Sequence, residues 1–243
     1  MMMSKNPVEE LLSQIPQIEE RIKYVFQDKQ LLVLAFVHRS FFNEHRDLVQ
    51  QHNERLEFLG DSVLGLMISD YLYVQLPLEP EGFLSQLRSH IVEASSCAQM
   101  LGQLGIAHHV LLGRGERMND GRGRETILAD LFEALIGAIY LDSDIESAKT
   151  FFFSHFSEKI QEHLRKPLRN WKAELQDYSQ KKYQKPPAYK ILKESGPDHS
   201  KMFHVIAYID EKEAGEGTGT SKKEAEQAAA EDALKKLGVM QNV

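Results

Sequence analysis

The sequence contains a single cysteine, Cys97, among 243 residues. One thiol can form neither an intrachain disulfide nor a multi-cysteine zinc site, so we expect the chain to work in the reducing cytoplasm. Long apolar runs are also lacking, because the longest uncharged ones, 31–37 and 134–141, fall well short of the roughly 20 residues that a membrane helix needs. The first ten residues hold no apolar signal core. These absences predict a cytoplasmic protein without a membrane span.

Nucleotide and histidine-metal motifs are absent as well. No GxxxxGK[ST] phosphate loop occurs, and the glycines of the stretch at 113–123 lack the spacing that cradles a nucleotide. The sequence has 10 histidines, but no HExxH pair brings two of them to one helix face. The sequence therefore predicts neither a nucleotide cofactor nor a histidine-bound metal.

The negative charge is concentrated in the first part of the chain. The net charge is -7 overall, but residues 1–168 hold 16 basic and 24 acidic side chains, whereas residues 169–243 hold 13 and 12. The apolar helical pattern stops near Arg165 and Lys166. We therefore predict two domains, at 1–165 and 169–238.

The first domain is predicted to be all-α. Helical periodicity covers four segments, at 31–37, 56–76, 83–102 and 126–141. Helix-breaking residues separate them, namely Pro77, Pro80, Gly102 and the Gly/Arg stretch at 113–124. Alternating strand patterns are absent. Glycines at 60, 65 and 137 inside these helices each cost about 1 kcal/mol relative to alanine, and close helix–helix approach would explain them.

Five carboxylates stand out in this domain. Glu54, Glu57 and Asp61 form one helical stripe, because steps of three and four residues return to the same face. Asp130 and Glu133 lie on a helix that is otherwise apolar on every side and must be buried. A solvated acidic face or a salt bridge to arginine could explain each group alone. Because basic residues nearby are few, a divalent cation is favoured, and oxygen ligands suit Mg²⁺ or Mn²⁺ in phosphoryl transfer.

The second domain is predicted to have the order α-β-β-β-α. A helix at 170–183 precedes two strand-like segments, of which 203–209 alternates as a one-sided strand, and a third strand ends in "EGTGT". Ser221 and Glu224 form a capping box at the start of the last helix. Lys222 and Lys223 then lie at a helix N-terminus, which attracts phosphate.

The string "NERLEFLGDSVLG" at 53–65 resembles the signature of the ribonuclease III family. The strings "AFVHRSF", "EGFLSQLR" and "ETILADLFEALIGAIYLDSD" resemble its neighbouring segments in the expected order. The resemblance implies an all-α endonuclease domain that acts on double-stranded RNA as a homodimer. By position, Glu57, Asp130 and Glu133 match metal ligands and Asp61 matches an essential catalytic carboxylate. Two further acids, Glu54 and Glu81, match residues lining the same cleft.

The resemblance also suggests how these residues divide their roles. Asp61 and Glu133 are expected to place the nucleophilic water, while Glu57 and Asp130 chiefly fix the ion, which activates water and stabilises the leaving oxygen. Phe58 could pack in the core, but the family suggests a dimer contact. The arginines of the loop at 114–124 could contact phosphate, but a solvated loop explains them equally, and the predicted site does not include them.

The string "GTGTSKKEAEQAAA" at 217–230 resembles the double-stranded-RNA-binding domain. The resemblance assigns RNA contact to Gln176 and Asp177 on the first helix, His199 between strands, and the Lys222–Lys223 pair. Such a domain spans about 16 base pairs and recognises 2′-hydroxyls and phosphate spacing rather than bases.

Together, the acid pattern and the two resemblances imply a Mg²⁺-dependent, homodimeric endoribonuclease that cuts both strands of RNA duplexes. By resemblance it leaves 5′-phosphate and 3′-hydroxyl ends with short 3′ overhangs, and processes precursor ribosomal RNA and other structured transcripts. One alternative is a protein that binds duplex RNA without cutting it. Another is a structural helical dimer whose acids merely bind ions, which leaves the second domain unexplained.

Overall fold

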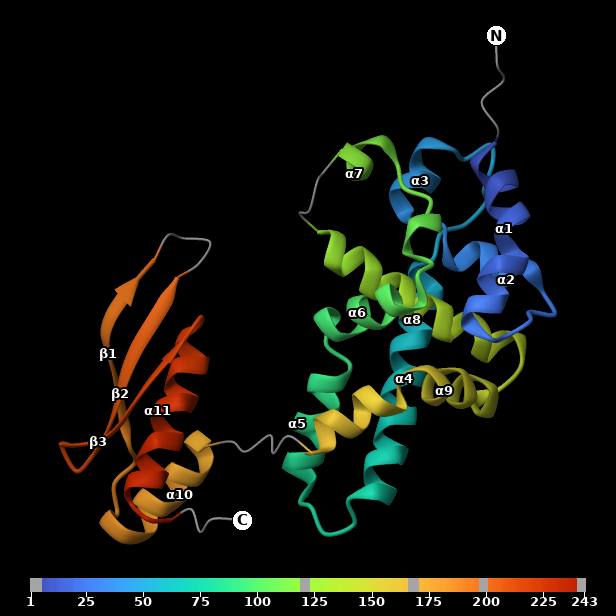
Figure 1. Cartoon of the computed structure of the whole chain (residues 1–243). Helices are drawn as coiled ribbons and strands as arrows, with labels where there is room; N and C mark the ends of the chain where they lie inside the picture. The colour runs from blue at the N-terminus through green and yellow to red at the C-terminus, as the bar shows by residue number, and fades with distance from the viewer. Residues whose placement is uncertain (1–5, 119–122, 166–170, 197–200, 240–243) are drawn as a thin grey trace. The chain divides into compact units, whose positions relative to one another are not determined.

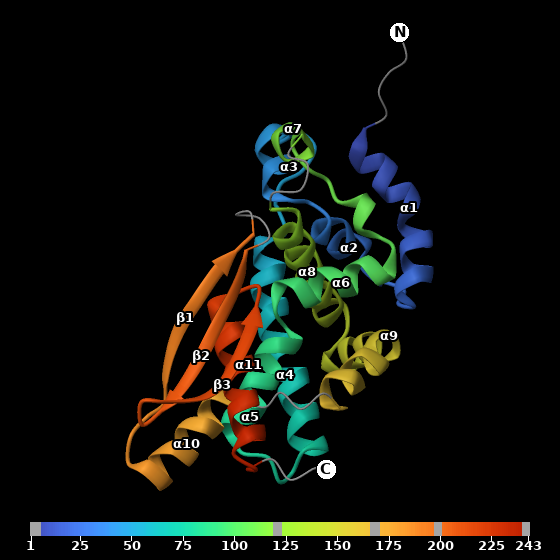
Figure 2. The same cartoon turned by 60° about the vertical axis from the view of Figure 1, so that its left-hand side comes forward.

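The computed structural model describes residues 6–118, 123–165, 171–196 and 201–239. The chain divides into two compact units, Met1–Leu168 and Arg169–Val243, each with its own hydrophobic core. Over the described residues, the first unit is helical apart from one isolated bridge between Val37 and Leu111. The second combines two helices with a three-stranded sheet (Figures 1 and 2). This arrangement confirms the predicted fold class.

The first unit is built around α8. Its helices are α1 (Pro7–Ile22), α2 (Lys29–Ala35), α3 (Arg39–Glu44), α4 (Glu54–Gln75), α5 (Glu81–Ile91), α6 (Ala94–Leu104), α7 (Arg114–Met118), α8 (Arg124–Asp142) and α9 (Ile145–Arg165), with a 3-10 turn η1 (Ala107–His109). As the apolar composition of α8 predicts, its residues from Ala134 to Ile139 are all buried. The helix packs most extensively on α4, and also on α6 and α2. No helix in the described part of the chain could cross a bilayer.

The segment 83–102 is two helices, not the single helical stretch that its periodicity predicts. α5 ends at Ile91 and α6 begins at Ala94, because Glu93 takes an extended backbone conformation between them. Gly102 lies inside α6, and Gly105, at φ 67°, ends that helix instead. The Gly/Arg stretch also contains a short helix, α7. Apolar spacing continues across the turn at 92–93, so the periodicity alone does not reveal it.

Close helix approach explains two of the three helical glycines. A Cβ at Gly60 on α4 would overlap the Glu133 carbonyl oxygen of α8, and a Cβ at Gly137 would overlap the Leu56 carbonyl oxygen. At Gly65 a Cβ would meet no heavy atom within 4 Å, so the prediction is wrong there. The α4–α8 crossing is therefore centred on Gly60 and Gly137, where only hydrogen fits between the backbones.

The second unit runs α10 (Trp171–Tyr183), β1 (Ala188–Ser195), β2 (Met202–Ile209), β3 (Lys212–Gly219) and α11 (Lys222–Lys236). The strands pair antiparallel in the order β1-β2-β3. Alternate β2 side chains, Val205, Ala207 and Ile209, are buried with the alanines of α11. The Ser221 hydroxyl accepts from the Glu224 amide at 3.2 Å, as predicted for the cap. The Glu224 carboxylate accepts from the Thr220 amide at 2.7 Å, and hydrogen bonds from the Thr220 side chain and from the Thr220 and Ser221 backbones help to hold its pKa below the ordinary value.

Candidate functional site

The acids of α4 and α8 gather where the two helices cross. Asp61 follows Gly60 directly on α4, and Glu133 supplies the backbone oxygen that lies against Gly60. Glu57 lies one turn before Asp61, and Asp130 one turn before Glu133, on the same helix faces. The glycine crossing thus brings together four acids that are far apart in the sequence.

The pKa shifts show that these carboxylates influence one another. The pKa of Glu133 rises from 4.5 to about 7, first because of burial and then because of Asp61, Glu57 and Asp130. Burial also raises the pKa of Glu57, reinforced by Asp130, Glu54 and Asp61. The pKa of Asp130 rises through burial and Glu54. Every charged group behind these three shifts is another carboxylate, so mutual repulsion adds to burial in raising the pKa values.

This donor set fits a hard divalent cation. Carboxylate oxygens are the ligands that Mg²⁺ and Mn²⁺ prefer, and a bound cation would offset both the burial and the repulsion that raise these pKa values. No three His, Cys, Asp or Glu side chains in the described ranges converge closely enough to hold a metal by themselves. Mg²⁺ usually binds through one or two carboxylates and keeps several waters or substrate phosphate oxygens.

Glu54 lies at the edge of the cluster and has basic partners of its own. Arg39 Nη1 donates to its Oε1 at 3.2 Å, and His52 Nδ1 lies 3.8 Å from Oε2. Arg39 comes from the "AFVHRSF" segment and was missing from the predicted site. Only its place in that string could have pointed to Arg39. Arg39 and Glu54 lie on different helices, so helical spacing could not relate them.

Glu81 lies apart from the other acids within this chain. It begins α5, beyond the C-terminal end of α4, where its Oε1 accepts from the Ser85 hydroxyl at 2.9 Å. From Glu57 to Gln75, α4 rises about 27 Å. Figure 1 shows α5 starting after the turn that follows the far end of α4. The structure therefore does not bring Glu81 to the acids at the α4–α8 crossing of the same chain.

Phe58 is 77% exposed, which excludes core packing within this chain. Two more exposed apolar side chains, Leu66 at 61% and Tyr73 at 74%, fall within about 80° of Phe58 around α4. We call Phe58, Leu66 and Tyr73 the α4 stripe. Sequence reasoning missed Leu66 and Tyr73, although their helical spacing from Phe58 was a usable signal. An aligned set of large exposed apolar side chains is typical of a protein-binding surface.

The predicted RNA-contacting residues lie on two helices of the second unit. Gln176 and Asp177 are exposed on α10, and Lys222 and Lys223 are exposed in the first turn of α11. The Asp177 carboxylate is paired with Lys181 Nζ at 2.7 Å. His199 lies outside the described residues.

Glu194, at the end of β1, binds two nearby lysines. Its Oε2 lies 3.1 Å from Lys201 Nζ, and its Oε1 lies 3.8 Å from Lys222 Nζ. Because all three side chains are well exposed, the ion pairs are weak and can exchange for phosphate contacts.

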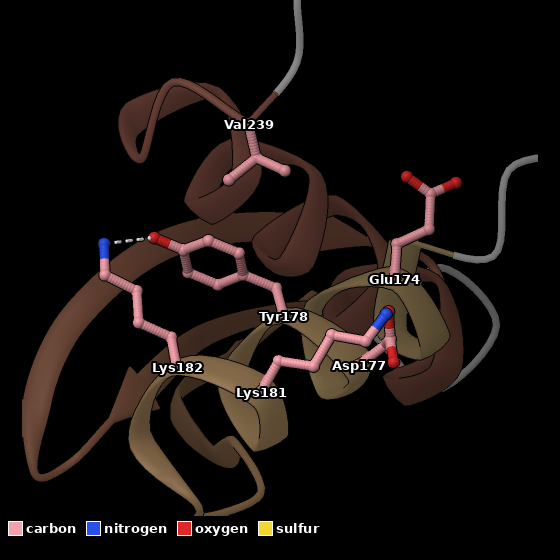
Figure 3. Close-up of a pocket in the computed structure, with 6 residues that line it drawn as sticks. All are labelled: Glu174, Asp177, Tyr178, Lys181, Lys182 and Val239. Atoms are coloured by element: carbon pink, nitrogen blue, oxygen red, sulfur yellow. Dashed lines mark hydrogen bonds and ion pairs between the residues drawn. The ribbon is translucent and has the colours of Figure 1, made fainter.

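An open hollow on α10 lies beside Asp177. Its lining consists of Glu174, Asp177, Tyr178, Lys181, Lys182 and Val239. In Figure 3 the Lys182 ammonium reaches the Tyr178 hydroxyl, at 2.8 Å. The Asp177 carboxylate offsets the charge of Lys181, whereas Lys182 is bonded to a hydroxyl and keeps its positive charge. None of the acids at the α4–α8 crossing lines it.

Both units match known families. Residues 28–160 match the family described as Ribonuclease-III-like, and residues 171–237 match the double-stranded RNA binding motif. The chain is 62% identical over 232 residues to Ribonuclease 3 of Protochlamydia amoebophila, covering 96% of each protein. It is 46% identical over 226 residues to Ribonuclease 3 of Borreliella burgdorferi, covering 93% of this chain and 92% of the relative.

Solved structures agree for the first unit. A nuclease domain of ribonuclease III from Campylobacter jejuni superposes with a TM-score of 0.54 at 38% identity, covering 59% of this chain and 96% of that chain. Its description concerns flexibility in a region involved in dimer formation. A second structure of that domain gives a TM-score of 0.52 at 35% identity, covering 64% of this chain and 98% of the other.

Proposed function

The chain belongs to the ribonuclease III family and is a double-strand-specific endoribonuclease. From that premise we propose that it hydrolyses phosphodiester bonds of duplex RNA at the acids of the α4–α8 crossing, leaving 5′-phosphate and 3′-hydroxyl ends with short 3′ overhangs. The proposed substrates are precursor ribosomal RNA and other structured transcripts in the cytoplasm. The observation that carries this proposal is the half-buried Glu133, whose charged neighbours are all carboxylates.

Family membership implies dependence on a divalent metal, and we propose Mg²⁺, with Mn²⁺ as a substitute. One or two of Glu57, Asp130 and Glu133 would hold the ion directly and the rest through its waters, and the ion when bound would supply charge neutralisation and an activated water. Asp61, exposed beside them on α4, would orient that water toward the phosphorus. Glu133 would both bind the ion and position the water, because its backbone lies against Gly60 where the two helices cross. Glu54 is better suited to the rim of the cleft, because Arg39 already neutralises it.

We propose that the active form is a homodimer joined through the α4 stripe, with Phe58 as a central contact. The exposure of the stripe in a single chain supports this assignment. The position of Glu81 also supports a homodimer, because this acid lies far from the α4–α8 crossing of its own chain. It can line a cleft with the other acids only if a second copy brings it there.

The proposed domains are a nuclease at 1–165 and an RNA-binding domain at 169–238. In the second, Gln176 and Asp177 of α10 would enter the minor groove, while Lys222 and Lys223 at the N-terminus of α11 would contact phosphates. His199 remains a proposed contact by resemblance alone. Recognition of backbone shape then selects RNA duplexes over DNA, because 2′-hydroxyls distinguish the two.

The competing function is duplex binding without cleavage. A binding protein has no need of four neighbouring carboxylates, three of them half-buried, because such charges lower stability unless a cation joins them. The cluster therefore favours a nuclease.

The decisive test is Glu133→Gln, assayed with the full chain on a long RNA duplex in Mg²⁺. The substitution preserves volume and removes the charge, so duplex binding should persist while single-turnover cleavage slows by about 100-fold or more, because the loss falls on the transition state. Glu125→Gln, an exposed acid in the first turn of the same helix, is the matched control and should cut like the wild type. Wild-type cleavage by Glu133→Gln at limiting Mg²⁺ would remove Glu133 from the site.

A further inference from the structure

A lysine and a glutamate join the two helices that carry the proposed RNA contacts. Lys172 Nζ of α10 lies 2.5 Å from Glu226 Oε2 of α11, and both side chains are half-buried. The Lys172 backbone amide donates to the neighbouring Gln227 Oε1 at 3.2 Å. The first turn of α10 is thus bonded to two successive residues of α11.

The position of this pair relative to the RNA contacts is specific. Lys172 lies one helical turn before Gln176 on α10, and Glu226 lies one turn after Lys222 on α11, so each shares a helix face with a contacting residue. The lysine ammonium also lies 4.8 Å from the centre of the Tyr189 ring of β1. A cation held between a carboxylate and an aromatic face has little rotational freedom, so it restrains both helices against the sheet.

Neither Lys172 nor Glu226 is expected to increase RNA affinity by direct contact. A glutamate on the phosphate-facing side of α11 repels RNA, and a lysine already neutralised by it attracts phosphate weakly. A duplex-binding domain must nevertheless present α10 to a minor groove and α11 to the adjacent phosphates at one spacing. An ion pair that fixes this spacing reduces the ordering cost of binding.

We propose that Lys172 and Glu226 are positioning residues that set the distance between the two RNA-contacting helices. This inference rests on the proposed RNA contacts of Gln176 and Lys222. Removing the negative charge of Glu226 is then expected to weaken the binding of a negatively charged ligand.

The test compares full-length variants binding a duplex of about 16 base pairs in EDTA, where no cleavage occurs. Glu226→Gln should weaken binding by about three- to tenfold, the usual size of coupling between paired residues. Its salt dependence should stay unchanged, because no phosphate contact is lost. The matched control is Glu231→Gln on the same helix, whose partner Lys235 is on α11 itself. That control removes the same charge without breaking a link between helices and should bind as tightly as the wild type or tighter.

Further variants separate positioning from other roles. Lys172→Met combined with Glu226→Gln should bind no more weakly than the weaker single variant, and Lys172→Arg should bind like the wild type. With Mg²⁺ present, Glu226→Gln should raise KM and leave kcat unchanged, and its melting temperature should match that of the wild type, because unfolding of the second unit would also raise KM.

Three outcomes would overturn the positioning role: unchanged or tighter binding by Glu226→Gln, a smaller salt dependence in Lys172→Met, or a fall in kcat alone. Failure of the wild-type chain to bind duplex RNA would instead contradict the proposed function.

Discussion

At the scale of single residues, the raised pKa of Glu133 makes the metal-free protein sensitive to pH. An acid whose pKa is near 4.5 when unfolded and about 7 when folded binds more protons in the folded state between those values. Stability in EDTA should therefore fall as pH rises through that window and level off above it. Thermal melting from pH 4.5 to 8 checks this, with Glu133→Gln as the reference, because the variant lacks the titrating group. Equal pH dependence of the two proteins would contradict the shift.

At the scale of elements, the α4–α8 crossing depends on the absence of side chains at Gly60 and Gly137. Gly60→Ala would press a methyl group on the Glu133 carbonyl, so we expect a loss of about 1–3 kcal/mol of stability and slower cleavage, as the acids move apart. Gly102→Ala is the control, since a Cβ there meets nothing within 4 Å, and it should stabilise α6 by about 1 kcal/mol. Urea unfolding and cleavage rates measure both effects; an equally stable and active Gly60→Ala would show that the helices can separate without cost.

At the scale of the whole molecule, the α4 stripe predicts a concentration-dependent dimer. Phe58→Asp places a charge where a second copy would bury an aromatic ring, so sedimentation should shift toward monomer while helical content is retained. The cleavage rate should fall as the dimer dissociates, because Glu81 can reach the acids of the α4–α8 crossing only from another copy. Val25→Asp, at a site 72% exposed, is the matched control and should remain dimeric. A dimeric Phe58→Asp would place the interface elsewhere.

The features that the sequence predicted correctly depend on neighbours along the chain. Helical periodicity predicted the buried α8, alternation predicted the inward face of β2, and Ser221 predicted the start of α11. These patterns are local, because backbone hydrogen bonds and side-chain periodicity extend over only a few residues. The acid types and their spacing on each helix are likewise visible in the sequence, and they indicate divalent-metal chemistry.

Only the tertiary structure decided which of these helices, strands and side chains come into contact. It separated α5 from α6, left Gly65 without a neighbour, exposed Phe58, and set Glu81 apart from Glu57. It also paired Lys172 with Glu226, residues separated by the whole sheet in sequence. Distances between segments depend on how whole faces pack, and a single hydrogen at Gly60 or Gly137 determines whether two backbones touch. The sequence by itself therefore determined the chemistry on each element, and packing decided which groups share a site.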